Sequence, residues 1–92
     1  MKTVCRFEFP DEIVRELFEA QLAQSFIVAE SIYGRPKVRI NASCYNSDQK
    51  PQLIIDVSTE IGEYIAQVFT GLITRALGEE NFTVERITKD EE

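Results

Sequence analysis

The hydrophobic positions of residues 58–78 follow the period of an amphipathic helix. Apolar side chains recur there three and four residues apart for more than four turns, at Ile61, Tyr64, Ile65, Val68, Phe69, Leu72, Ile73, Ala76 and Leu77. Ser58 is a suitable N-cap, Glu60 favours the positive end of the helix dipole, and Gly78 suits the left-handed position beyond the last turn. This predicted helix is the clearest element in the chain.

Other segments alternate between polar and apolar residues, as half-buried strands do. Residues 2–9 predict one such strand, which ends at Pro10 and has as its inward side chains Cys5, Phe7 and Phe9. Residues 37–45 predict another, with the inward side chains Val38, Ile40, Ala42 and Cys44. Residues 52–57 are the most apolar short run and predict a central strand, while residues 82–87 predict the last strand.

A further helix is expected to begin near Asp11, with an apolar face of Ile13, Val14, Leu17 and Phe18. Its end has two interpretations, because Gln21 and Gln24 fall on that face and the helical phase degrades after Ala20. In the first, the helix continues to Tyr33 and is closed by Gly34, with Pro36 just beyond. In the second, it ends near Gln24 and the β-branched residues within 26–33 form a strand.

With the helical interpretation, the predicted order is β-α-β-β-α-β, which is the split βαβ arrangement of ferredoxin-like folds. Residues 1–88 would form a single α+β domain, a two-layer sandwich with both helices on one face of an antiparallel sheet. Right-handed crossovers place the strands of residues 2–9 and 52–57 in the middle. The strand interpretation adds a fifth strand, and residues 89–92 form an acidic tail that is expected to be mobile.

Composition bounds the class of protein. The chain has 92 residues, of which 43% are hydrophobic and 28% charged, as in an average globular domain. The formal charge of −6 repels phosphate, so neither nucleic acid nor an anionic membrane is expected as a partner. The sequence contains no apolar run of transmembrane length, and its first residues carry charge too early for a signal peptide. We therefore expect a cytoplasmic protein.

The sequence offers few groups for catalysis or metal binding. It contains no histidine, and its two cysteines, Cys5 and Cys44, are too few for a disulfide scaffold or a zinc site. We therefore expect no enzymatic activity, metal or cofactor. The predicted strand order separates the two cysteines by two strand spacings, roughly 9–10 Å, which is beyond disulfide reach. Both thiols are expected to be free and buried.

Arg35, Lys37 and Arg39 are candidates for binding a small anion, together with Tyr45. Their spacing puts the three basic side chains on one face of the predicted strand, and Arg6 could join them. The alternative is that they protect a sheet edge from edge-to-edge pairing. In that case they would form cross-strand ion pairs with carboxylates of the sheet, at Glu8, Asp56 and Glu85.

Carboxylates are the remaining candidates for acid–base chemistry. Most lie on predicted helix faces that are wet and keep them ionised, namely Glu12, Glu16, Glu19, Glu60 and Glu63. Asp56 differs because it lies inside an apolar run. It is either buried against Arg6 or Arg39, or exposed on the open side of the sheet.

The apolar arc of the long helix spans roughly 220°, wider than one-sided packing requires. A ridge of small residues lies in or beside this arc, at Gly62, Ala66, Thr70 and Thr74. The first helix could cover the ridge, or a second copy of the chain could. We therefore expect a non-enzymatic, acidic interaction or regulatory module that forms a homodimer and binds another protein. In topology the predicted order is similar to ACT-type regulatory domains, which implies as the alternative a small-anion-binding regulatory domain.

Overall fold

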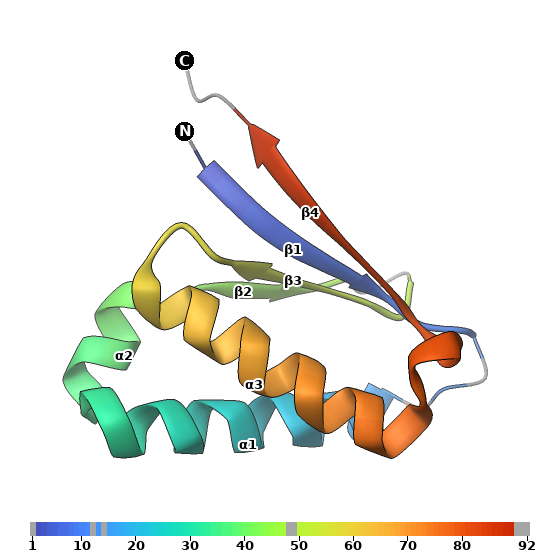
Figure 1. Ribbon diagram of the computed structural model, residues 1–92, viewed down its shortest axis with the longest axis horizontal. Helices are drawn as coiled ribbons and strands as arrows, with labels where there is room; N and C mark the ends of the chain where they lie inside the picture. The colour runs from blue at the N-terminus through green and yellow to red at the C-terminus, as the bar shows by residue number, and fades with distance from the viewer. Residues whose placement is uncertain (1, 12, 14, 48–49, 90–92) are drawn as a thin grey trace.

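The protein is an α+β domain with one four-stranded antiparallel sheet. The computed structural model describes residues 2–11, 13, 15–47 and 50–89 (Figure 1). In chain order its elements are β1 (Lys2–Glu8), α1 (Arg15–Tyr33), α2 (Arg35–Asn41), β2 (Cys44–Asn46), β3 (Gln52–Asp56), α3 (Glu60–Leu77), the 3-10 helix η1 (Glu79–Asn81) and β4 (Thr83–Lys89). Of the predicted tail, only Lys89 lies within the described residues, and it ends β4.

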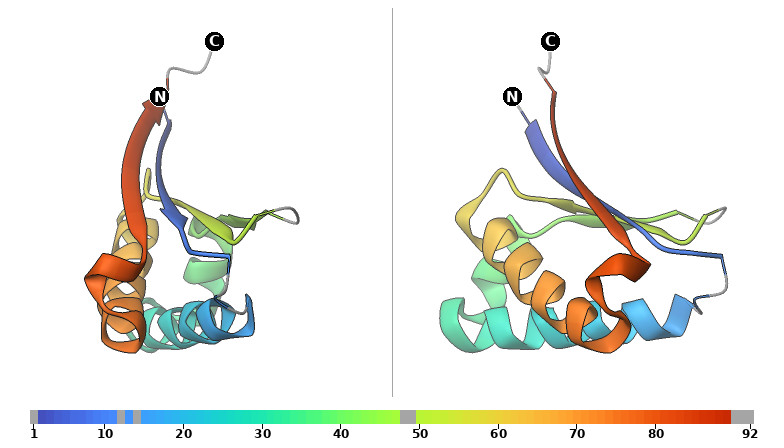
Figure 2. Two further views of the ribbon diagram at one scale, coloured as in Figure 1. Left: turned by 90° about the vertical axis from the view of Figure 1, so that its right-hand side faces the viewer. Right: turned by 45° about the vertical axis from the view of Figure 1, so that its right-hand side comes forward.

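The strands are arranged in the order β2-β3-β1-β4, so β1 and β3 are central, as predicted. All three α-helices lie on one face of the sheet, and the other face is open (Figures 1 and 2). Alternation along the central strands sends Phe7 and Leu53 toward the helices, where both are fully buried. Arg6 points to the open face, between Ile54 of β3 and Glu85 of β4.

Aromatic rings join the sheet to two helices. Phe9, just beyond β1, stacks on Phe18 of α1 with ring centroids 4.5 Å apart. Phe7 of β1 meets Phe69 of α3 edge to face at 4.9 Å. Aromatic pairs in these geometries contribute beyond the area that they bury, so this cluster is the centre of the core.

The first helix continues to Tyr33, and the alternative strand over residues 26–33 is wrong. The helix is bounded as Arg15–Tyr33 and so begins later than predicted; Glu12 and Val14 lie outside the described residues. The buried face of α1 continues along the helix because two small residues, Ser25 and Ala29, occupy fully buried positions. The Ser25 hydroxyl is satisfied there, since it donates to the carbonyl of Gln21 at 2.8 Å.

The strand predicted for residues 37–45 is also wrong. Residues 35–41 form α2, and β2 comprises only Cys44–Asn46. Gly34 reverses the chain with a φ of 90°, which favours glycine, and Pro36 suits the first turn of a helix. Val38 and Ile40 were expected on one face, yet Val38 is 1% exposed and Ile40 81%.

The long helix is confirmed as α3. Its N-cap is Thr59 rather than Ser58, and the Thr59 hydroxyl accepts from the backbone N–H of Gly62 at 3.0 Å. The same hydroxyl donates to the carbonyl of Asn41 at 2.8 Å, which ties α3 to the end of α2. The Ser58 hydroxyl instead accepts from the backbone N–H of Thr3 at 2.9 Å.

Candidate interaction surface

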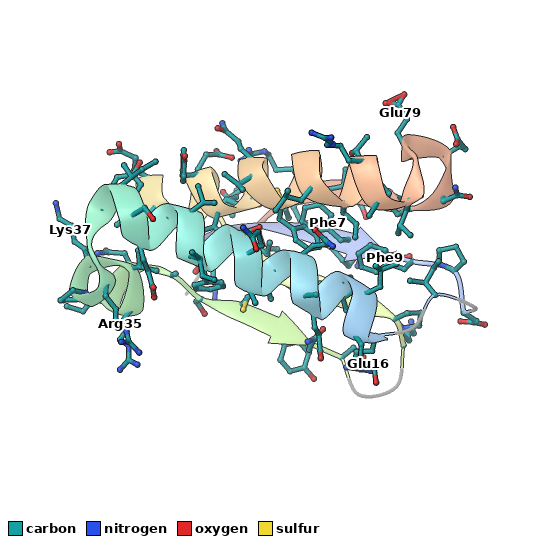
Figure 3. The ribbon with its side chains drawn as sticks, turned by 90° about the horizontal axis from the view of Figure 1, so that it is seen from below. Phe7, Phe9, Glu16, Arg35, Lys37 and Glu79 are labelled. Atoms are coloured by element: carbon teal, nitrogen blue, oxygen red, sulfur yellow. The ribbon has the colours of Figure 1, made fainter. Side chains whose placement is uncertain are left out.

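The predicted basic cluster lies on α2 and not on a strand. At about 100° per residue, Arg35 and Arg39 share one flank of a helix while Lys37 lies on the other. Arg35, Pro36 and Arg39 line an open hollow of about 450 Å³. Lys37 lines a separate hollow with Tyr33 and residues of the α3 N-terminus. Figure 3 shows Arg35 and Lys37 pointing to opposite sides of α2.

Tyr45, the fourth predicted ligand residue, lies on β2 and is 61% exposed. It lines a small hollow of about 70 Å³ with residues of the open sheet face, among them Val4 and Ile54. None of the three basic residues of α2 lines this hollow. The structure therefore does not bring the four predicted ligand residues into one site, and their role in binding stays a prediction.

Lys2, Arg6 and Arg86 of the sheet form ion pairs, whereas none is found for the cations of α2 among the described residues. Arg6 forms ion pairs with Glu8 at 3.1 Å and with Glu85. Among the described residues, no carboxylate forms an ion pair with Arg35, Lys37 or Arg39. The expected cross-strand ion pairs of these three residues are therefore not found in the described part of the chain, and α2 carries uncompensated positive charge.

The small-residue ridge of α3 is used partly inside the domain. A Cβ at Gly62 would lie 2.1 Å from the carbonyl oxygen of Asp56, so glycine is required where α3 passes the end of β3. Ala66 and Thr70 line a hollow of about 340 Å³ between α3 and β4. Thr74 is half-buried. Gly71 is exposed and has no heavy atom within 4 Å of a built Cβ, so no described contact explains it.

The outer face of α1 is the feature that sequence reasoning missed. Its exposed residues at helical spacing, called here the α1 stripe, are Glu16, Ala20, Ala23, Gln24, Ile27 and Ser31. Only Glu16 is charged, and Ile27 is 57% exposed at the centre of the stripe. The available signal was the absence of charged residues from positions 20–29, where only the glutamines on the apolar face had been considered.

Other exposed apolar side chains lie near the C-terminal end of this stripe. Ile32, in the last turn of α1, is 59% exposed, and Ile40 of α2 is 81% exposed. With Ile27, these make three of the five large hydrophobic residues that the described structure exposes, the others being Tyr45 and Val84. Large exposed apolar residues can mark an interaction site, and these three lie on two consecutive helices, with Ile27 and Ile32 about 140° apart around α1. The layer formed by α1 and α2 is therefore the strongest candidate surface.

The helix carboxylates bind neighbouring groups of the domain. Glu63 accepts two hydrogen bonds from Arg86 at 2.7 and 2.9 Å, and this contact raises the pKa of the Arg86 guanidinium. Glu60 accepts from the Tyr33 hydroxyl at 3.4 Å. Burial raises the pKa of Tyr33, and the charge and hydrogen bond of Glu60 raise it further. These contacts are structural, and Tyr33 is held protonated in the physiological range.

Asp56 is bound by neither Arg6 nor Arg39. One of its carboxylate oxygens accepts from the backbone N–H of Ser58 at 2.8 Å. The other lies 3.9 Å from the Lys2 ammonium on the open face, and the side chain is 23% exposed. Asp56 therefore shapes the turn from β3 into α3.

Both cysteines are free, as predicted, but only Cys5 is buried. Ile55 is the direct cross-strand partner of both, so the two thiols flank it on the same side of the sheet. Cys44 is exposed because β2 is an edge strand. Burial raises the pKa of both thiols, and this desolvation acts on Cys44 despite its exposed surface. In the described residues, no group of three His, Cys, Asp or Glu side chains is placed to hold a metal ion.

Comparison with known proteins identifies no family for this chain. The sequence matches no protein-family model and no curated protein. Within the described part of the chain, none of the helices combines the length and the apolar character needed to cross a membrane.

Proposed function

We propose that the protein is a small, non-enzymatic, cytoplasmic interaction module that acts as a homodimer and binds another protein. For its fold we propose a ferredoxin-like βαββαβ plan with α2 added before β2, which the order of elements and the two central strands support. The observation that carries the function is the α1 stripe, because a surface helix of a monomer normally presents charged residues to water.

Burial of this surface would be favourable. Removing a large aliphatic side chain from water stabilises by about 1.5–3 kcal/mol when burial is complete. Ile27 and Ile40 are more than half exposed in the monomer, at 57% and 81%, and so retain much of this gain for a partner. Alanines at positions 20 and 23 would allow a second helix to approach closely. A partner that covers α1 therefore gains apolar burial without burying unpaired charge at the centre.

The test is the solution mass, measured by light scattering on a sizing column across a hundredfold range of concentration. We expect a dimer that dissociates on dilution and that Ile27→Lys shifts to monomer. Val84→Lys is the matched control, because Val84 is 47% exposed on β4, outside the helix layer. A wild-type protein that stays monomeric throughout would contradict the homodimer, and equal effects of the two variants would show that the dimer does not use the α1 stripe.

Binding of a small anion is a second candidate function. It is favoured by the hollow between Arg35 and Arg39, where two guanidinium groups lie on one helix flank without an ion pair to any described carboxylate. Titration with inorganic phosphate, followed by calorimetry, tests it. Arg39→Gln should abolish the heat of binding, while Lys50→Gln, an exposed cation elsewhere, should not. Equal heats for the two variants would show that the hollow is not the site.

A further inference from the structure

The helix layer carries opposite charges at the two ends of α1. From this we infer that two copies of this chain pair through their α1 stripes in antiparallel orientation, so that Glu16 of each copy lies against Arg35 and Arg39 of the other. The inference rests on the proposed homodimer and specifies its surface, its symmetry and its ion pairs.

The charges are distributed as such a pairing requires. The acidic end of the layer has the exposed carboxylates Asp11 and Glu16, before and within the first turn of α1. The basic end has Arg35, Lys37 and Arg39 on α2. Between the two ends, the α1 stripe has no charged residue. A parallel pairing would place like charges together, whereas an antiparallel pairing joins opposite charges twice.

The charged residues at the two ends of α1 also lie on the side that an antiparallel pairing requires. Glu16 and Arg35 point to the same side of α1, from its two ends (Figure 3). A two-fold axis that lies in the interface and runs perpendicular to α1 exchanges the ends and keeps the side. It therefore brings Glu16 of one copy over Arg35 of the other, and the same contact recurs at the far end.

The reach of the side chains agrees with this arrangement. If the axis passes between Ala23 and Gln24, Ala20 lies opposite Ile27 and Glu16 lies opposite Ser31 of the second copy. Arg35 begins α2 two residues beyond the end of α1 at Tyr33, so its long side chain lies near the end of the pairing where Glu16 of the second copy is placed. Small residues at the centre permit the close helix contact that this register needs.

This pairing also assigns a role to the open hollow beside Arg35 and Arg39. A carboxylate from the second copy would fill it, so in the dimer the two arginines act as specificity residues, and this role is the alternative to the small-anion site. The positive charge that the monomer leaves uncompensated is then neutralised on assembly.

Charge reversal tests the inference. Glu16→Arg alone and Arg35→Glu/Arg39→Glu alone each place like charges together at both ends of the homodimer, and each should weaken dimerisation about tenfold or more. Mixing the two variants restores attraction at both ends, so we expect a heterodimer that forms at the wild-type concentration. Glu79→Arg is the matched control, since Glu79 is exposed on η1 and lies on the side of the helix layer opposite to Glu16 and Arg35 in Figure 3.

The outcomes separate this inference from the proposed function. A wild-type dimer that all reversals leave unchanged would overturn the antiparallel α1 pairing but keep the homodimer. A wild-type monomer would remove both. Failure of the mixture to form a heterodimer, with both variants folded by circular dichroism, would also reject the pairing. Should a reversal impair folding, Glu16→Gln and Arg35→Gln/Arg39→Gln must each weaken the dimer by a smaller factor.

Discussion

The helices α1 and α3 lie side by side on the same face of one sheet, yet they differ in what they present to solvent. α3 begins with a side-chain cap at Thr59, has acidic residues in its first turn, and has Arg75 in its last. α1 has no basic residue in its last turn, and its outer stripe is nearly free of charge. In the described structure α3 exposes no large hydrophobic residue, whereas α1 exposes Ile27 and Ile32.

Because of this difference, the helix with the most regular apolar pattern is not the one that carries the candidate interaction surface. The regular apolar ladder of α3 is used in the core, where six residues of the helix are buried. α1 buries only three, and two of these are Ser25 and Ala29. A helix with a small buried contact and an uncharged outer face is better explained by packing on both sides. The weaker pattern therefore identifies the candidate interaction surface.

The largest expected effects concern the buried sides of the two helices, which should be equally important. Phe18→Ala in α1 and Phe69→Ala in α3 should each lower the free energy of unfolding by about 3–5 kcal/mol, because both rings are fully buried. Urea denaturation at one fixed protein concentration measures this. Ile27→Ala on the α1 stripe is the control and should change the stability of the monomer by less than about 0.5 kcal/mol.

The next largest effect tests the close approach of α3 to the sheet. Gly62→Ala should cost about 1–3 kcal/mol, because the new methyl group would lie 2.1 Å from the Asp56 carbonyl oxygen and the backbone must shift. Thermal unfolding of the variant measures the loss. An unchanged melting temperature would show that α3 does not pass β3 at this distance.

Capping of α3 gives a smaller effect. Thr59→Ala removes the acceptor for the Gly62 N–H and the donor to Asn41, and should cost about 1–2 kcal/mol. Ser31→Ala on α1 removes an exposed hydroxyl bonded only to the preceding turn, and should be near neutral. If the two variants unfold at the same urea concentration, Thr59 does not cap α3.

Two substitutions of exposed small residues in mid-helix should change the stability in opposite directions. Gly71→Ala on α3 should raise stability by about 0.5–1 kcal/mol, since a methyl group meets nothing and helix propensity improves. Ala20→Gly on α1 should lower it by about the same amount. Both values come from urea denaturation at a concentration where the protein is monomeric. A loss of stability in Gly71→Ala would reveal a packing contact at that position.

The smallest expected effect is a loss of folding stability at alkaline pH. Burial raises the pKa of the Cys5 and Cys44 thiols above their ordinary value of 9.0. The folded protein therefore keeps these protons at a pH where the unfolded chain loses them. This contribution is full below about pH 9 and declines as pH rises through the folded pKa values. Unfolding in urea at about pH 8 and about pH 10 should show a smaller loss for the Cys5→Ala/Cys44→Ala variant than for wild type.

Much of the fold could be predicted from local pattern. The ladder of α3 and the alternation of β1 each extend over many residues, so one mismatch does not change the period. The two central strands followed from the handedness of crossovers. The candidate site could not be predicted in the same way. Arg35, Lys37 and Arg39 were assigned to one face because a strand was assumed, and a helix separates Lys37 from the other two.

The sequence by itself determined α3, the central strands and the absence of histidine chemistry, because periodicity and composition do not depend on long-range contacts. Tertiary structure decided between helix and strand for residues 26–41, since their short apolar runs fit both periods. Burial of Ser25, Ala29 and Val38 selected helices there and turned Ile27 and Ile40 to the surface. The surface proposed for dimerisation is a consequence of that choice, because the same residues on strands would have been divided between the two faces of the sheet.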